Sequence, residues 1–443
     1  MSQRIAIMGA GLVGSLLANY LAKRGFQVSV YEKRADPRKA DLAAGRSINL
    51  ALSHRGLRAL EGVGLAEEVQ QLVIPMKGRM MHDVEGNLTF QPYGKEGQHI
   101  NSVSRSGLNE LLIQRAEEKG AQFYFNHKVE KVDPEATEAL LSDEQGSEFA
   151  VTPDLLIGAD GAFSNVRKSF MRYDRFSYSQ HYIEHGYKEL TLPPTLGGNF
   201  ALRPNALHIW PRRSYMLIAL PNLDRSFTVT LFFPFEGRPS FETVTNRDAM
   251  WNFFRGAFPD VVGLMPELEQ EFFQNPTSSL VTVKCFPWVK KRTLILGDAS
   301  HAIVPFYGQG MNAGFEDCRV FDEYVEQYGT DWDNLLVAYQ KERKPDADAI
   351  SELALKNFTE MRDHVANESF LLRKKIEARL HELYPEDWMP LYSMVTFSDL
   401  RYSEALSLGK QQAKIMDGVM QQDGVFLNWE MLNFKKIVRQ LKK

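Results

Sequence analysis

The stretch RIAIMGAGLVG, from Arg4 to Gly14, decides the fold of this chain of 443 residues. Its mostly apolar first half, residues 4–8, predicts a short buried strand, and the periodicity of residues 15–24 predicts a helix. Between them lies a G-x-G-x-x-G turn. Strand, glycine-rich turn and helix in this order are the context that a dinucleotide-binding site requires.

Each glycine of the turn has a physical role. Gly9 permits the tight turn, Gly11 lets the backbone approach a pyrophosphate, and Gly14 lets helix and strand pack closely. Residues 27–31 predict a second strand, and Glu32 at its end stands about 20 residues on, where an acid binds a ribose hydroxyl. A glycine turn without a ligand is the plain alternative, but the acid and both flanking elements favour cofactor binding. The predicted contacts are Gly9, Gly11, Leu12, Val13, Gly14 and Glu32.

A second informative stretch is GDASHAIVPFYGQGMN, residues 297–312. The apolar run 293–296 predicts a buried strand before it, and a helical pattern follows from about Met311. A carboxylate, Asp298, therefore stands at a strand end, and free backbone N–H groups lie at a helix N-terminus. Such a terminus binds an anion or a polarised ring edge.

A third segment, residues 154–167, also runs from an apolar strand through a turn to a helix start, where Ser164 is suited to cap the helix. Taken alone, it reads as an ordinary strand–turn–helix. In their order along the chain, the three segments resemble the motifs of FAD-dependent aromatic hydroxylases. The resemblance implies bound FAD, with further contacts from Arg46, Arg105, Asp160, Asp298, Pro305, Gly308, Gln309, Gly310, Met311 and Asn312.

Composition is typical of a soluble cytoplasmic enzyme. The formal net charge is −4, which gives no electrostatic case for nucleic acid. Two cysteines, Cys285 and Cys318, are too few for a disulfide framework and are expected to be buried. No apolar run approaches the length of a membrane span, no signal peptide precedes the first strand, and no metal site is predicted.

We expect an α/β fold with a Rossmann-like FAD-binding domain of the aromatic-hydroxylase type, a β-sheet substrate domain and a helical C-terminal region. The FAD-binding domain is expected to be discontinuous, over 1–70, 100–170 and 291–330. The substrate domain takes 71–99 and 171–290, and the helical region, 331–443, covers the active site. Only one G-x-G-x-x-G fingerprint is present, so a nicotinamide cofactor has no dinucleotide domain of its own.

Longer blocks of sequence sharpen the resemblance. Those at 77–80, 91–94, 205–211, 219–228, 304–312 and 392–398 are similar to the kynurenine 3-monooxygenase family. The resemblance implies that NADPH and dioxygen are used to hydroxylate L-kynurenine to 3-hydroxy-L-kynurenine through a flavin hydroperoxide, in tryptophan degradation. It does not extend residue by residue over 405–443.

The same resemblance implies a clamp for the amino-acid end of the substrate. Arg79 suits bidentate pairing with a carboxylate, and Tyr93 and Tyr392 add hydroxyl donors. Asn357 and Glu360 are three residues apart on a predicted helix and share a face. The expected substrate contacts are Arg79, Tyr93, Asn357, Tyr392, Phe306, Met361 and Glu360.

Taken one at a time, these residues are equally well interpreted as surface or packing residues. The prediction of a clamp therefore depends on their occurring together. No general base and no catalytic residue is assigned, because the ring amine of the substrate already donates electrons. His301 and His208 are expected to be structural. A homodimer is possible from the sequence, and the choice between NADPH and NADH stays open.

Three alternatives stay open at this stage. Another aromatic hydroxylase acting on a phenolic acid is the nearest. A non-catalytic flavin-fold binding protein is the second, and a flavin halogenase is the most remote. The last segment, residues 429–443, predicts a helix docked on the body, with a membrane-surface role as the lesser reading.

Overall fold

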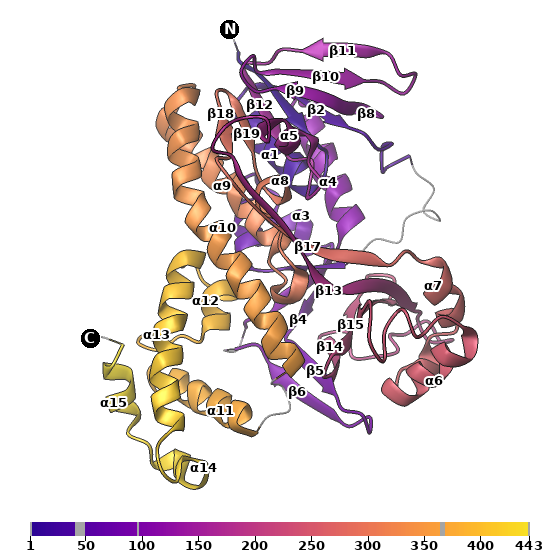
Figure 1. The fold of residues 1–443 in the computed structure, drawn as a ribbon, viewed down its shortest axis with the longest axis vertical. Coiled ribbons are helices and arrows are strands. Elements are labelled where there is room, and N and C mark those ends of the chain that lie inside the picture. Colours follow the sequence, from indigo (N-terminus) through magenta and orange to yellow (C-terminus); the bar gives the residue numbers. More distant parts are fainter. Residues whose placement is uncertain (1, 40–48, 95–96, 364–367, 442–443) are drawn as a thin grey trace.

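The computed structural model describes residues 2–39, 49–94, 97–363 and 368–441, and of residues 359 and 361–363 it describes the backbone alone. Figure 1 shows an elongated molecule in which one sheet lies near the N-terminus and a second sheet lies below it. Long helices connect the two levels on one side. Arg46 lies outside the described residues.

The upper sheet is six-stranded in the order β18-β19-β12-β1-β2-β8, parallel except for the edge strand β18. The helices that pack on it include the one predicted after the glycine-rich turn. The strands are β1 Arg4–Met8, β2 Gln27–Glu32, β8 Gln122–Phe125, β12 Leu155–Gly158, β18 Val289–Lys290 and β19 Thr293–Ile295. The helices are α1 Leu12–Lys23, α4 Arg105–Glu118, α5 Asn165–Phe170, α8 Asp298–His301 and α9 Gly310–Tyr328.

Two small antiparallel sheets join this body. The order β11-β10-β9 forms a meander at the outer edge, and β3-β7-β4 lies between the two large sheets. Their strands are β3 Asn49–Leu52, β4 Val73–Met76, β7 Ile100–Ser104, β9 Lys128–Asp133, β10 Glu138–Ser142 and β11 Glu148–Val151. The helices α2 His54–Glu61 and α3 Ala66–Gln70 follow β3.

The lower sheet is seven-stranded in the order β17-β13-β16-β15-β14-β5-β6. Alternating apolar residues predicted these strands, but the amphipathic helices within the same region were not expected. The strands are β5 Gly78–His82, β6 Leu88–Pro92, β13 Ser177–Leu192, β14 Leu207–Arg212, β15 Tyr215–Pro221, β16 Phe227–Pro234 and β17 Ser278–Phe286. The helices are α6 Arg247–Ala257, η1 Val262–Leu264 and α7 Leu268–Gln274.

The described residues from 305 onward are mostly helical, in agreement with the helical pattern predicted from about residue 311. These elements are η2 Pro305–Tyr307, α10 Trp332–Asp363, α11 Glu368–Leu383, α12 Leu391–Phe397, α13 Tyr402–Met420, α14 Val425–Asn428, η3 Trp429–Met431 and α15 Phe434–Arg439. The prediction of one helix over 429–443 is wrong, because Asn433 breaks the segment and caps the short α15. Phe434, Ile437 and Val438 nevertheless pack into a local core with α11 and α13.

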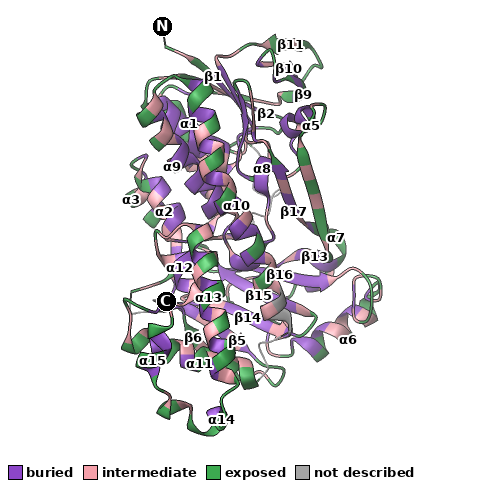
Figure 2. Ribbon diagram, turned by 60° about the vertical axis from the view of Figure 1, so that its left-hand side comes forward, coloured by how far each residue is buried: buried purple, intermediate pink, exposed green. Residues whose placement is uncertain are grey.

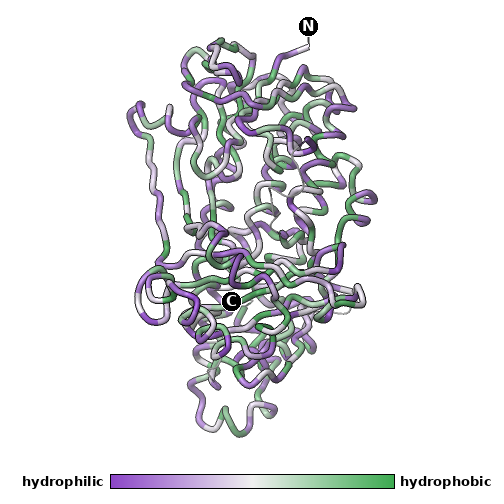
Figure 3. Tube along the Cα trace, turned by 90° about the vertical axis from the view of Figure 1, so that its right-hand side faces the viewer, coloured by the Kyte–Doolittle hydropathy of each residue, from purple (hydrophilic) through white to green (hydrophobic). Residues whose placement is uncertain are grey.

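Burial follows these layers. Figure 2 shows the central strands β14, β15 and β16 of the lower sheet mostly buried, while the outward faces of α10 and α13 are exposed. Both cysteines are buried and unpaired, as expected. Figure 3 shows hydrophilic and hydrophobic residues mixed along the described chain. Among the described residues, no helix combines the length and the apolar character that crossing a membrane requires.

Candidate active site

The glycine-rich turn leaves room for a ligand at one glycine and none at the other two. A Cβ atom on Gly14 would collide with the carbonyl oxygen of Gly9, and one on Gly9 would collide with Ala159. Gly9 also has φ of 108°, which side chains disfavour. A Cβ on Gly11 would meet nothing within 4 Å. The turn is therefore packed tightly against the sheet but open at Gly11, where a pyrophosphate would approach.

Glu32 lies where the sequence predicts it, at the end of β2. Its Oε2 accepts the backbone N–H of Ala10 at 3.0 Å, and its Oε1 accepts hydrogen bonds from Arg34. Burial opposes the charge, but these bonds outweigh it and hold the pKa of Glu32 below its usual value. The carboxylate is thus charged and anchored to the glycine-rich turn.

The second motif touches the first. The side chain of Val13 on α1 lies against both Gly297 and Gly314, where a Cβ atom would crowd it. Gly297 has φ of 59° and ends the strand, so Asp298 stands exposed at the start of α8. Close contact between α1 and the Gly297 loop brings the two predicted FAD motifs to one end of the upper sheet.

A buried ionic cluster fixes this loop. Nε2 of His301 lies 2.6 Å from Oδ2 of Asp317, and the same oxygen accepts the N–H of Gly297. Arg343 of α10 binds Oδ1 of Asp317 at 2.9 Å and Glu316 at 3.0 Å. Burial opposes a charged ring, but the neighbouring Asp317 carboxylate raises the pKa of His301. His301 is therefore a structural residue of the loop, as the sequence indicates.

The N-terminus of α9 points its first N–H groups out of the helix. Residues Gly310, Met311 and Asn312 supply these groups, which have no partner inside the helix. The side chain of Asn312 is committed to the protein, since it donates to Ala51 and Gly308 at 2.8 Å. The helix terminus is thus offered to a ligand by its backbone.

Two further side chains hold the same loop. Oε1 of Gln309 accepts the hydroxyl of Tyr402 at 2.8 Å, and Pro305 opens the turn η2 that precedes α9. Gly308 has φ of 66°, so the turn needs glycine at this position. The loop is therefore shaped before any cofactor arrives.

The third motif also caps a helix. Oδ2 of Asp160 accepts the N–H groups of Asn165 and Val166 at the start of α5, and Ser164 caps the same helix by accepting the N–H of Arg167. Burial raises the pKa of Asp160. The helix-capping role predicted for Ser164 is confirmed.

Together these features fit FAD. The glycine turn, the free N–H groups of α9 and Asp298 lie on connected elements, and Arg105 at the start of α4 acts electrostatically on Asp298. Arg105 is exposed. These residues thus offer backbone N–H donors to the phosphates and the ring edge of FAD. Arg105 lies at the edge of this site.

The predicted substrate clamp is assembled in part. The guanidinium of Arg79 lies 4.6 Å from the ring centre of Tyr392 and 5.4 Å from that of Tyr93. These two tyrosines stack at 5.8 Å, and Tyr392 stacks on Tyr307 at 5.5 Å. None of the ion pairs found among the described residues involves Arg79. The hydroxyl oxygen of Tyr93 is buried and has no hydrogen-bond partner there either.

The helix α10 forms the next wall. Nδ2 of Asn357 donates to the carbonyl oxygen of Phe306 at 2.7 Å, and Phe306 stacks on Phe358 with ring centres 4.3 Å apart. Glu360 lies near enough to Tyr307 to raise its pKa, although burial is the larger cause. The side chain of Met361 lies outside the described residues.

Sequence reasoning missed a buried network behind the clamp. Nδ1 of His82 lies 2.6 Å from Asp260, and its Nε2 lies 2.8 Å from Nδ1 of His208. His208 in turn binds the carbonyl oxygen of Arg203 at 2.9 Å. These residues are far apart in sequence, so no local pattern announces their contact. The network confirms the structural role expected for His208.

The comparisons with known proteins agree with this arrangement. Residues 2–354 match the family model described as an FAD binding domain. The chain is 50% identical over its full length to a kynurenine 3-monooxygenase of Flavobacterium johnsoniae, covering 99% of that protein. It is 47% identical to the Sus scrofa protein of the same name, covering 93% of this chain and 88% of that one.

Solved structures show the same fold. A 2-methyl-3-hydroxypyridine-5-carboxylic acid oxygenase aligns with a TM-score of 0.68 at 22% identity, covering 82% of this chain and 94% of that one. A tetracycline destructase aligns with a TM-score of 0.62 at 18% identity, covering 91% of this chain and 99% of that one. With motifs, geometry and relatives in accord, the chain belongs to the kynurenine 3-monooxygenase family of FAD-dependent monooxygenases.

Proposed function

We propose that this protein hydroxylates L-kynurenine to 3-hydroxy-L-kynurenine with NADPH and dioxygen, a step of tryptophan degradation. The observation that carries the proposal is the half-buried Arg79 between the rings of Tyr93 and Tyr392, with no carboxylate of the described chain paired to it. A guanidinium placed in this way suits the carboxylate of an amino acid. The buried Tyr93 hydroxyl beside Arg79 is suited to supply a further donor.

The aromatic end of the substrate has a matching wall. Phe306 is nine-tenths buried and packs between Phe358 and Phe232 at 4.3 and 5.1 Å. An aromatic ring placed beside this cluster is held by stacking and edge contacts. Asn357 fixes the carbonyl of Phe306 and thereby the turn that carries it. Glu360 stands on the same face of α10 and is suited to the substrate amino group.

When held by the glycine-rich turn and the N-terminus of α9, FAD would supply the redox chemistry between NADPH and dioxygen. The chain itself orients the substrate and excludes water. No side chain near Phe306 needs to act as a base, because the aniline nitrogen of the substrate activates its own ring. The buried tyrosine stack of Tyr93, Tyr392 and Tyr307 keeps this region dry.

The domain division expected from the sequence belongs to the same proposal. Residues 1–70, 100–170 and 291–330 hold FAD, residues 71–99 and 171–290 form the substrate domain, and 331–443 cover the site. The seven-stranded sheet, which carries Arg79 on β5, supports this division. A cytoplasmic location and a homodimer stay predictions from the sequence.

The test follows flavin absorbance. The purified holoenzyme is mixed anaerobically with NADPH, with and without L-kynurenine, and air is then admitted. We expect L-kynurenine to accelerate flavin reduction strongly. After air is admitted, we expect L-kynurenine to be converted to 3-hydroxy-L-kynurenine. A yellow protein that ignores L-kynurenine and responds to a phenolic acid would keep the family and overturn the substrate. A colourless protein unable to take up FAD would favour a binding role.

A further inference from the structure

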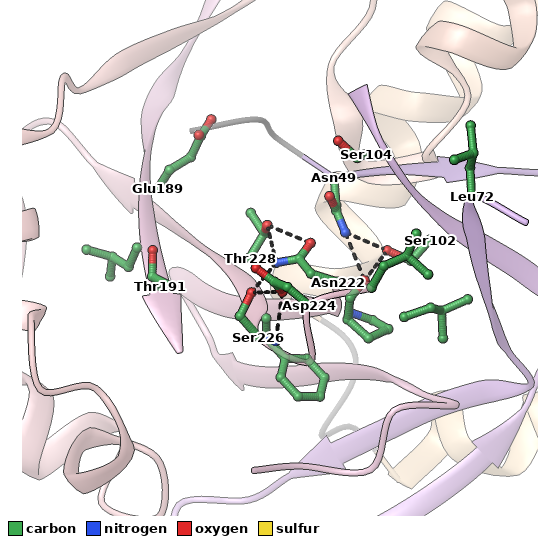
Figure 4. A pocket seen from close by; sticks show the side chains of 15 residues that line it. Asn49, Leu72, Ser102, Ser104, Glu189, Thr191, Asn222, Asp224, Ser226 and Thr228 are labelled. Carbon is green, nitrogen blue, oxygen red and sulfur yellow. Dashed lines mark hydrogen bonds between the residues drawn. The ribbon is translucent and has the colours of Figure 1, made fainter. Parts of the chain in front are cut away.

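A cavity of about 420 Å³ with both apolar and polar lining residues opens between the small sheet β3-β7-β4 and the strands β13, β15 and β16. Figure 4 shows Glu189 and Thr191 of β13 on one side, Asn49 and Ser102 on the other, and the β15–β16 turn between them. The volume lies in the range of small-molecule sites. The residues predicted for the substrate clamp are not among those that line it.

The cavity adjoins the predicted flavin site. Asn49 lines it on β3, and two residues further along the same strand the carbonyl of Ala51 accepts the Asn312 amide at 2.8 Å. On β15 the chain turns from Leu220, which packs with Tyr93, to Pro221, which lines the cavity. On β15, the cavity and the clamp are thus contacted by adjacent residues. On β3, the cavity lies two residues from the position that binds the start of α9.

Most polar groups around the cavity already bind one another. Asn49 and Ser102 both donate to the carbonyl of Pro221 at 2.9 Å, and Asp224 accepts the hydroxyl of Ser226 at 2.6 Å. Glu189 differs, since its carboxyl group takes part in none of the hydrogen bonds or ion pairs recorded for the described residues. Burial raises the pKa of Glu189 to about 7, although the Arg105 charge opposes the rise.

The lining also restricts the charge of a ligand. Among the described residues it includes two carboxyl groups, those of Glu189 and Asp224, and no lysine, arginine or histidine. The two carboxyl groups disfavour a phosphate beside them, while hydroxyl and amide groups are matched by serine, threonine and asparagine side chains. A neutral group with an N–H donor for Glu189 fits best.

We propose that this cavity binds the nicotinamide–ribose end of the reductant. The inference rests on the proposed function, because it assumes that a nicotinamide dinucleotide reduces the flavin. The carboxamide N–H₂ donates to Glu189, and the ribose hydroxyls face Thr191 and the β15–β16 turn. A chain with a single dinucleotide fingerprint needs such a second, smaller site next to the flavin, because it has no separate domain for NADPH.

Two substitutions test the assignment in the FAD-loaded protein. Thr191→Leu fills the cavity from β13, and Glu189→Gln removes the titrating group without changing its size. We expect Thr191→Leu to raise the Kd for NADP⁺ by about 10-fold or more. Glu189→Gln is expected to weaken the dependence of this Kd on pH between pH 6 and pH 8, leaving the part that comes from the 2′-phosphate of NADP⁺, whose second pKa is about 6. Glu184→Gln, an exposed carboxylate on the same strand, is the matched control and leaves both unchanged.

The reductant can be truncated to locate the effect. Dihydronicotinamide mononucleotide lacks the adenosine half, so Thr191→Leu should slow flavin reduction by this compound as much as reduction by NADPH. The FAD content and the Kd for L-kynurenine should stay at parent values. An effect seen with NADPH alone, or a raised Kd for L-kynurenine instead, would overturn the assignment. A parent protein that NADPH does not reduce at all would instead refute the proposed function.

Discussion

The Nε2 atom of His82 lies 2.8 Å from the Nδ1 atom of His208, deep against Trp210 in the lower sheet. The two outer nitrogens of the pair face acceptors, the carboxylate of Asp260 and the carbonyl of Arg203. Two neutral rings carry only two N–H hydrogens for these three contacts, and the third hydrogen requires protonation of one ring. When all three bonds are made, the two rings share a single positive charge next to Asp260.

This relationship predicts a loss of stability in acid. Burial, the largest cause, lowers the pKa of His208 from 6.5 to about 4, so between these values the unfolded chain binds the proton more readily. The free energy of unfolding should fall as pH drops through this window, by about 3 kcal/mol in all. Urea unfolding at pH 7, 5.5 and 4 measures it.

The substitution His208→Gln should flatten this dependence, because glutamine can bridge His82 and the Arg203 carbonyl without titrating. Exposed His99 is the matched control, and His99→Gln should leave the pH profile as it is. An unchanged slope in His208→Gln would show that other groups govern acid unfolding.

The two glycines of the first turn should respond differently to alanine. In Gly11→Ala the new methyl group enters open space, so the apoprotein should keep its Tm while its affinity for FAD falls about 10-fold or more. In Gly14→Ala the methyl group collides with the Gly9 carbonyl, so the apoprotein itself should lose stability. Thermal unfolding of both apoproteins and flavin titration separate the two effects. Equal Tm losses would contradict the open space at Gly11.

The substrate clamp predicts a selective loss on changing Arg79. Arg79→Ala should raise the Kd for L-kynurenine by about 100-fold, since a charged hydrogen-bonded pair is worth roughly 2–5 kcal/mol when one partner is truncated. Bound FAD should be unaffected. Arg79→Lys should recover only part of the affinity, because lysine lacks the planar fork. Equilibrium titration gives these constants, and Lys77→Ala, an exposed cation two residues away, is the control.

The ionic cluster predicts a large structural effect of a residue outside both sites. Arg343→Leu leaves the buried carboxylates of Asp317 and Glu316 without their shared partner, which should cost about 3–5 kcal/mol in the free energy of unfolding. Arg319→Leu, nearer the surface and bound mainly to Glu323, should cost less than about 1 kcal/mol. Urea unfolding of the two holoproteins compares them, and similar losses would argue against the cluster.

Local patterns predicted the flavin half well. The strand at 4–8, the glycine turn and the cap at Ser164 depend on neighbouring residues, and the structure confirms them. The helices α6 and α7 were missed, because aromatic residues such as Phe253 and Phe254 are read as strand formers until their helical spacing is considered. The segment 429–443 was read as one helix despite Asn433, whose side chain favours a cap.

The site needed more than local pattern. Arg79, Tyr93 and Tyr392 come from distant parts of the chain, and only the family resemblance brought them together in advance. The contacts of His82 with Asp260 and the cavity beside Glu189 left no signal in sequence, because each depends on how β5, β13 and β16 align in one sheet. Long-range register is the information that a single sequence does not display.

The helix α10 carries Arg343 in the ionic cluster and Asn357 beside the clamp. These positions are separated along one helix by about 20 Å, at roughly 1.5 Å per residue. Any coupling that this helix carries between the two sites is reciprocal by thermodynamic linkage: whatever factor FAD loading adds to the affinity for the substrate, the substrate must add to the affinity for FAD. Retention of flavin by the purified protein thus becomes a measure of how well its distant clamp is filled.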